Sequence, residues 1–187
     1  YNYDQPLHHA NILASDDLNH LASKLGFKVL LSGDGADELF SGYSWVLNDY
    51  SNKSNQFIID SSALLNPTIL EQYLNTDFDN SVFANLKNDM DSLDNPTEKQ
   101  IYVDQKFYIQ KWFHRQDRSG MRSSVEIRVP YFTTKLLFVI NAISLKRRLK
   151  NFTVEKYMLK KIGLKYINPE IVMQKKVGFT IPVDDWL

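Results

Sequence analysis

The segment best suited to chemistry is a turn with two glycines and three acidic residues, Ser-Gly-Asp-Gly-Ala-Asp-Glu at 32–38. The glycines allow a sharp bend and a close approach of the backbone to a ligand. The turn follows an apolar run at 27–31, predicted as a β-strand, and a helix is expected after it. Ligands of open α/β sheets bind at the carboxyl ends of strands, and helix N-termini favour phosphate. The pattern predicts a phosphate site with Mg²⁺ balancing the acidic groups; a solvated turn with a helix cap is the alternative.

The elements expected to position this turn are mostly helices. We predict helices from Ser15 as a cap to Leu25 with Gly26 after it, from Thr97 onward, over 136–149, from Thr153 as a cap to Ile162, and over 169–174 with Asn168 as a cap. A polar turn is predicted at 116–120, and residues 48–98 have the composition of a solvated region with small helices. Strand character is found at 27–31 and again near 125–129.

These few strands determine the expected fold class. A lone parallel strand leaves backbone groups unpaired and both of its faces uncovered. Partner strands are therefore expected from further sequence. We predict an α/β fold in which this mostly helical chain is part of a larger parallel-sheet domain.

Composition excludes several classes of function. The 187 residues balance 22 Lys and Arg against 22 Asp and Glu, so charge gives no reason to expect nucleic acid or an anionic membrane as a partner. The absence of cysteine excludes disulfides, thiolate nucleophiles and Cys-ligated zinc, and is compatible with a reducing cytoplasm. No apolar run approaches the roughly 20 residues that span a bilayer. The chain starts at Tyr1 rather than methionine, and sequence upstream of it is expected.

Other conspicuous residues have simpler explanations. Lys146-Arg147-Arg148 ends a predicted helix, where cations suit the helix dipole. The four histidines have no metal-ligand spacing. Trp112-Phe113, with Phe107, is interpreted as helix packing rather than a base-stacking surface.

Four ordered blocks of sequence resemble the asparagine synthetase family. Val29–Tyr43 resembles S-G-E-G-A-D-E-L-F-G-G-Y, and Asp117–Met121 with Glu126–Phe132 resembles D-R-x-S-M…E-x-R-V-P-F-L-D. Lys156–Lys160 is similar to K-x-x-L-R, and Pro169–Leu187 is similar to the closing P-x-x-I…R-x-K-x-G-F…P…W-L. Asp4-Gln5-Pro6 and His9-Ala10-Asn11 are similar to the segment that precedes the first helix.

The resemblance implies the C-terminal part of a synthetase domain of the ATP-pyrophosphatase type, with an adenine-nucleotide α-hydrolase-like parallel sheet, over residues 1–187. Such an enzyme cleaves ATP to AMP and pyrophosphate, forms β-aspartyl adenylate and lets glutamine-derived ammonia displace AMP. The chemistry consists mainly of positioning and charge neutralisation. ATP, Mg²⁺, a carboxylic acid such as aspartate, and a glutaminase domain in the same full-length chain are the implied cofactors and partners. No nucleic acid or membrane is implied, and a homodimer is compatible with the family.

The resemblance also implies roles for individual residues. Ser32, Gly33, Asp34, Gly35 and Lys176 are expected to contact ATP. Asp37, with Asp34 and Glu38, is expected to hold Mg²⁺. Lys156 is expected to be the catalytic cation; without the resemblance it would be a helix-surface lysine.

Tyr43 and Glu126 are a further catalytic candidate. In the related β-lactam synthetases, a Tyr and a Glu are thought to act together as the catalytic base that deprotonates an internal nucleophile. In this chain both have a structural alternative, with Tyr43 packed in the core and Glu126 paired with Arg128 or Arg122. Ammonia needs less help from a base, which favours the structural role if aspartate is the substrate.

The sequence departs from the family pattern at four positions: Ser41 for Gly, Thr133 for Asp, Lys160 for Arg and Gln174 for Arg. These departures bear more on aspartate as the substrate than on ATP-dependent amide chemistry.

The family's other phosphate loop, S-G-G-x-D-S, is absent and is expected upstream, together with the glutaminase domain. Residues 1–187 alone are therefore predicted to be inactive. Two alternatives remain open. One is a related enzyme acting on another acid, as in β-lactam synthetases, lasso-peptide cyclases or glycan amidotransferases. The other is a non-catalytic module that binds a nucleotide or a partner.

Overall fold

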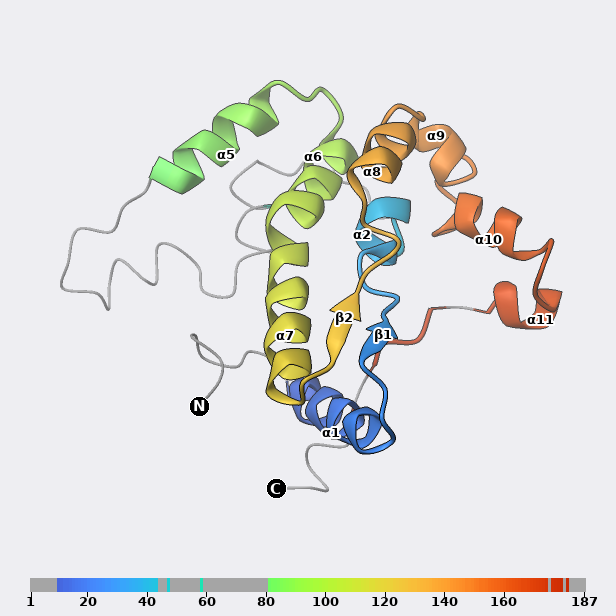
Figure 1. Ribbon diagram of the computed structural model, residues 1–187. Helices are drawn as coiled ribbons and strands as arrows, with labels where there is room; N and C mark the ends of the chain where they lie inside the picture. The colour runs from blue at the N-terminus through green and yellow to red at the C-terminus, as the bar shows by residue number, and fades with distance from the viewer. Residues whose placement is uncertain are drawn as a thin grey trace.

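The computed structural model describes residues 10–43, 47, 58, 81–174, 176–179 and 181, without the side chains of 82 and 83. This part is mostly helical with a small parallel sheet, as expected of a segment of an α/β domain (Figure 1). Its helices are α1 (Asn11–Lys24), α2 (Ala36–Phe40), α5 (Ser81–Asp91), α6 (Pro96–Val103), the π-helix η2 (Asp104–Tyr108), α7 (Ile109–Arg122), α8 (Thr134–Asn141), α9 (Leu145–Arg148), α10 (Tyr157–Gly163) and α11 (Pro169–Val172). The family-like segments at 4–6 and 182–187, His8, His9 and most of 48–80 lie outside the described residues.

The second strand predicted near 125–129 is confirmed. Strands β1 (Val29–Leu31) and β2 (Glu126–Arg128) pair in parallel, with Val29 opposite Glu126 and Leu31 opposite Arg128. The Ser32 backbone N–H extends the ladder by donating to the Arg128 carbonyl at 2.8 Å. The carboxyl ends of both strands therefore meet at the turn that begins with Ser32.

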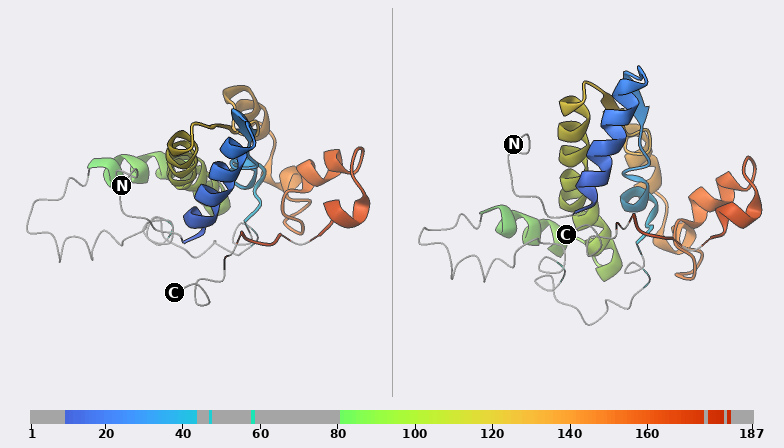
Figure 2. Two further views of the ribbon diagram at one scale, coloured as in Figure 1. Left: turned by 60° about the horizontal axis from the view of Figure 1, so that its bottom comes forward. Right: turned by 90° about the horizontal axis from the view of Figure 1, so that it is seen from below.

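Helices α1 and α7, which lead into the two strands, lie side by side (Figures 1 and 2). Two predictions about them were wrong. Ser15 is not a cap, because α1 begins at Asn11 and the buried Ser15 hydroxyl donates back to the Asn11 carbonyl. The polar turn predicted at 116–120 is helical, because Ser119 is buried against α1 and bonds to Asn19 and Asp16 there, at 2.7 Å in each case. Gly26 follows α1 as predicted, with φ 87°.

The long helix predicted from Thr97 is confirmed as a continuous path through α6, η2 and α7. It begins one residue earlier than predicted, with the Asn95 side chain accepting a hydrogen bond from the Thr97 N–H. The π-helical turn η2 has no sequence signal. It brings Gln105 to the α2 end of the molecule, where its amide donates to the Glu38 carbonyl at 3.1 Å.

The helix predicted over 136–149 is divided into α8 and α9 by a break at 142–144. The Asn141 side chain at the end of α8 bonds to Gln105 and Arg148, which fixes the break. The cap predicted at Thr153 was also wrong. Residues 150–152 have φ between 47° and 61°, so the chain makes a left-handed turn there and α10 starts only at Tyr157. The Asn168 cap of α11 is confirmed by its bond to the Glu170 N–H.

Two buried apolar clusters join α2 to α8 and α6 to α9. Leu39 and Phe40 of α2 pack with Ile140 of α8, and partly buried side chains of α10 join them. Ile101 of α6 packs with Leu145 and Leu149 around α9. Helices α10 and α11 lie on the opposite side of the strands from α5 and α6 (Figures 1 and 2). Among the described residues no helix is long and apolar enough to span a membrane.

Ser41 gives a testable stability effect. It adopts φ 58°, a left-handed conformation that costs a side-chain-bearing residue about 1–2 kcal/mol. Its buried hydroxyl meets no hydrogen-bond partner within the described part of the chain. We expect Ser41→Gly to raise the free energy of unfolding by about 1 kcal/mol in urea denaturation. The matched change Ser123→Gly, at φ −97°, should give no gain, and equal effects at both positions would contradict this account.

Candidate active site

The glycine-rich turn carries side chains from the end of β1 to the start of α2. Gly35 precedes α2 with φ 85°, and a side chain there would collide with Phe132, whose Cβ would lie 2.7 Å away. Ser32 donates to Asp34 Oδ2 at 2.5 Å and accepts from the Asp34 N–H at 3.2 Å. Gly33 has open space where a side chain would stand, so its backbone is accessible to a ligand.

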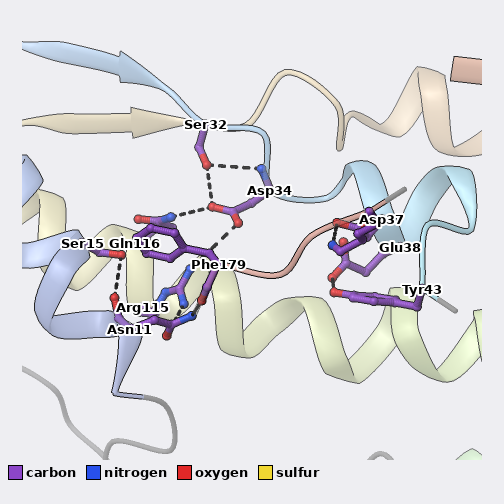
Figure 3. A network of polar contacts seen from close by, with 11 residues as sticks. Asn11, Ser15, Ser32, Asp34, Asp37, Glu38, Tyr43, Arg115, Gln116 and Phe179 are labelled. Atoms are coloured by element: carbon purple, nitrogen blue, oxygen red, sulfur yellow. Dashed lines mark hydrogen bonds and ion pairs between the residues drawn. The ribbon is translucent and has the colours of Figure 1, made fainter. Parts of the chain in front are cut away.

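Asp34 is held by helix α7 across the strand ends (Figure 3). Gln116 donates to Asp34 Oδ2 at 2.6 Å, and the Arg115 guanidinium lies 3.9 Å from Oδ1. Arg115 also donates to Asn11 of α1 at 3.0 Å. The Asp34 carboxylate is therefore a fixed group whose oxygens already have partners from the protein.

Asp37 lies between two lysines that are distant from it in sequence. Lys156 Nζ is 2.8 Å from Oδ1 and Lys176 Nζ is 2.5 Å from Oδ2. The Lys156 contact lacks the angle of a hydrogen bond, so among the described residues the buried Oδ1 has an ion-pair partner but no hydrogen-bond donor. Two cations on one carboxylate leave an excess of positive charge for an anionic ligand.

The backbone around Lys156 is strained and tightly packed. Lys156 has φ 52°, and its N–H points at the Ser41 carbonyl at 3.3 Å. A side chain at Gly42 would overlap both Asp37 Oδ1 and Lys156 Cε. Left-handed non-glycine residues are uncommon and are often found at functional sites. The position of the Lys156 ammonium is therefore set by close contacts with the end of α2.

Buried Glu38 of α2 pairs with Tyr43, which follows the helix and is half-buried (Figure 3). The Tyr43 hydroxyl donates to Glu38 Oε1 at 2.5 Å. Burial raises the pKa of the Glu38 carboxyl from 4.5 to about 7, although the Tyr43 hydrogen bond partly opposes it. Burial, together with the nearby Glu38 charge, also raises the pKa of Tyr43. The Tyr43 ring packs edge-on against Tyr108 and lies 5.1 Å from Lys176 Nζ.

This pair predicts a pH-dependent stability. A carboxyl whose pKa rises from 4.5 to about 7 on folding loses about 3 kcal/mol of stability as pH rises through that range, because the folded state holds the proton more tightly. Glu38→Gln keeps an acceptor for Tyr43 but does not titrate. Its stability relative to the wild type should therefore grow by about 3 kcal/mol between pH 4.5 and pH 8 in urea denaturation. The exposed Glu170→Gln should show no such trend, and a pH-independent difference for Glu38→Gln would contradict the assignment.

These groups surround one open cavity of about 830 Å³. Asp34, Asp37 and Glu38 line it from the turn and α2, Lys156 from the start of α10, and Lys176 from the segment after α11. The end of η2 contributes Tyr108, and helix α7 contributes Trp112, Arg115 and Gln116. A volume of this size is in the range of small-molecule sites.

The family model described as asparagine synthase matches residues 1–187, the whole chain. The chain belongs to the asparagine synthase family. It is 26% identical over 200 residues to asparagine synthetase (glutamine-hydrolyzing) 1 of Bacillus subtilis strain 168, covering 85% of this chain and 31% of that protein. It is 24% identical over 182 residues to asparagine synthetase (glutamine-hydrolyzing) 3 of the same strain, covering 88% of this chain and 29% of that protein. No solved structure gives a significant match.

The chain thus spans about a third of the length of these asparagine synthetases. The family-like blocks converge on the cavity: the turn block supplies Asp34 and Asp37, the K-x-x-L block supplies Lys156, and the closing block supplies Lys176.

Glu126 lies outside the cavity in this member of the asparagine synthase family. Its carboxylate accepts from Arg128 at 3.0 Å on β2, and about half of its side chain is exposed. It does not line the cavity, and the carboxylate bonded to Tyr43 is that of Glu38. Ser32 does not line the cavity either, and its hydroxyl donates to Asp34. The geometry corresponds to the structural alternative for Glu126.

Several cavity residues of η2 and α7 were not predicted from the sequence. Tyr108, Trp112 and Arg115 are spaced four and three residues apart, which places them on one helix face. Trp112 was interpreted only as packing, but it lines the cavity, whereas Phe113 packs against Phe132. The periodicity of polar and aromatic residues within this face was the available signal.

The carboxylates fit a magnesium ion that arrives with ATP better than a preformed metal cage. Among the described residues no group of three or more His, Cys, Asp or Glu side chains is placed to hold a metal. Asp34 and Glu38 accept hydrogen bonds from Gln116 and Tyr43, respectively. Asp37 Oδ1, which faces the Lys156 ammonium at 2.8 Å, would serve as a single ligand once that lysine turns to the phosphates. One or two carboxylates plus phosphate oxygens are the usual ligands of such an ion.

Proposed function

We propose that the protein carrying this chain is an ATP-dependent amide-forming ligase that converts aspartate to asparagine, with AMP and pyrophosphate as the other products. The observation that carries this proposal is Asp37 held between Lys156 and Lys176 beside a glycine-rich turn at a strand end. Family membership supports the reaction class. Residues 1–187 are proposed to be the C-terminal part of the synthetase domain, in a cytoplasmic protein with a glutaminase domain elsewhere in its chain.

In the first step, the side-chain carboxylate of aspartate attacks the α-phosphorus of ATP. A bond forms between the carboxylate oxygen and phosphorus, the bond to the bridging oxygen breaks, and pyrophosphate leaves. Gly33 and Gly35 offer backbone for close contact with the phosphates, and Lys156 and Lys176 supply positive charge beside them. Magnesium held by Asp37 would neutralise phosphate charge.

In the second step, ammonia adds to the acyl carbon of the adenylate, loses a proton, and AMP leaves to give the amide. Lys156 is suited to stabilise the negative oxygen of this transition state, because its ammonium is fixed at the cavity wall. Ammonia is already a competent nucleophile, so no dedicated base is required. Glutamine is the proposed source of that ammonia.

The test is a panel of acids assayed with the natural protein that contains residues 1–187. Pyrophosphate, AMP and the amide product are measured with ATP, Mg²⁺, ammonia and one acid at a time. We expect aspartate to stimulate all three products in equal amounts. Stimulation only by another acid would point to a β-lactam, lasso-peptide or glycan-type relative. No pyrophosphate with any acid would favour a non-catalytic binding module and contradict the proposal.

A further inference from the structure

One charged pair near the cavity has no part in the steps above. Lys160 Nζ lies 3.4 Å from Glu155 Oε1, and the two side chains are only 13% and 18% exposed. Both residues line the cavity of about 830 Å³ and also a second cavity of about 710 Å³. The pair therefore lies in the wall between the two cavities. Apolar side chains such as Val154 and Met173 line the second cavity.

The pair is built onto the same turn as the proposed catalytic lysine. The Lys160 N–H donates to the Lys156 carbonyl at 2.8 Å, so the two lysines are one helical turn apart. Both lysines line the same cavity of about 830 Å³. The two carboxyl carbons of a four-carbon dicarboxylic acid are roughly 4 Å apart when extended, from standard bond lengths. A short dicarboxylate can therefore contact both ammonium groups at once.

Glu155 is fixed as an anion. Burial would raise the pKa of its carboxyl, but the Glu155 backbone N–H, the Lys160 ammonium and the Lys176 backbone N–H hold that pKa below its usual value. The 3.4 Å separation of the pair is longer than a charged hydrogen bond of about 2.7–2.9 Å. A ligand bearing one positive and one negative charge can replace this loose contact with two tighter ones.

We propose that Glu155 and Lys160 form the specificity subsite for an α-amino dicarboxylic acid. Glu155 binds the α-ammonium group and Lys160 binds the α-carboxylate, while the side-chain carboxylate lies at Lys156. This inference rests on the proposed function for the identity of the reacting carboxylate. Each α-substituent then binds a side chain of the opposite charge, and both side chains lie within one helical turn of Lys156. An ATP phosphate is the other anion that Lys160 can bind, and the experiment distinguishes the two.

The test compares binding of three acids to the natural protein by titration calorimetry, with α,β-methylene-ATP and Mg²⁺ present. Aspartate carries both α-groups, succinate lacks the ammonium group, and β-alanine lacks the α-carboxylate. We expect Glu155→Gln to weaken aspartate about 10- to 100-fold and leave succinate unchanged. Lys160→Gln should weaken aspartate and succinate and leave β-alanine unchanged, with Lys160→Arg restoring most of the affinity. The exposed changes Glu170→Gln and Lys161→Gln are the matched controls.

Three results would overturn this subsite. The first is wild-type affinity that does not distinguish aspartate from succinate and β-alanine. The second is equal weakening of all three acids in both variants, and the third is a Lys160→Gln effect on the nucleotide rather than on the acid. Pyrophosphate release is measured in parallel to separate the two proposals. Selective binding of aspartate without turnover supports the subsite and contradicts the ligase proposal. Aspartate-dependent turnover that neither variant changes supports the ligase and contradicts the subsite.

Discussion

We expect Lys156→Met to lower kcat for aspartate-dependent pyrophosphate release by about 100- to 1,000-fold. The Lys156 ammonium lies 2.8 Å from Asp37, and its side chain is only 21% exposed. Charge that develops on the phosphates and on the acyl oxygen would therefore meet a fixed cation in a partly water-excluded site. Methionine has similar length but no charge, so the electrostatic contribution is removed with little change in volume. The measurement is steady-state release of pyrophosphate at saturating ATP.

The control for this change is Lys161→Met on the same helix. Lys161 is exposed, and its replacement should change kcat by no more than about twofold. Circular dichroism of both variants checks that α10 remains folded. A folded Lys156→Met enzyme within tenfold of wild-type kcat would show that this lysine is structural.

The second large effect is expected from Gly42→Ala, which adds one methyl group. That group would overlap Asp37 Oδ1 and Lys156 Cε, and its carbon would stand 3.0 Å from Asp37 Cα. Asp37 and Lys156 must therefore separate. A misplacement of about 1 Å in such groups lowers kcat/KM by about 100-fold. We expect that loss in the acid-dependent assay, together with a destabilisation of about 1–3 kcal/mol from overpacking.

Gly163→Ala is the matched control, because its methyl group would meet only Val172 at 3.4 Å. Gly163 ends α10, so this change tests the same helix away from Asp37. Its kcat/KM should remain close to that of the wild type. If both alanine variants retain wild-type kcat/KM, the close approach at Gly42 has no catalytic importance.

The elements around the turn could be predicted because their signals are local. The apolar run at 27–31 and the glycines after it predicted β1, the turn and the start of α2. The contact of Asp37 with Lys176 spans 139 positions in sequence, and no local pattern indicates it. Only the family resemblance placed these residues in one site, and it left the geometry open. The pairing of Tyr43 with Glu38 rather than Glu126 depends on how α2 ends, which periodicity does not show.

The errors in helix bounds have tertiary causes. Ser15 has the sequence features of a cap, but it is buried at the interface of α1 and α7. The polar residues at 116–120 have the features of a turn, but Gln116 and Ser119 bond to Asp34 and to α1, respectively. Thr153 follows three residues with positive φ, a conformation that these residue types rarely adopt. The resulting turn leads into α10, which contacts α9.

The apolar stripe of α1 was predicted correctly as a pattern but is not buried in the described part of the chain. Leu18, Leu21 and Leu25 are between 54% and 67% exposed, and Leu31 of the adjoining strand is 75% exposed. Apolar surface of this extent normally packs against another layer. We propose that further strands and helices of the synthetase domain cover this face, and that the cavity takes its final shape when they do.

The most direct test of the central claim is the fate of an oxygen label. Aspartate with ¹⁸O in its side-chain carboxylate is incubated with the natural protein, ATP, Mg²⁺ and ammonia, and the products are analysed by mass spectrometry. Attack of the carboxylate on the α-phosphorus followed by displacement of AMP transfers one labelled oxygen to AMP. We predict AMP that carries one ¹⁸O and is formed in equal amount with asparagine. Unlabelled AMP, or label found in inorganic phosphate instead, would contradict an acyl adenylate formed at this site.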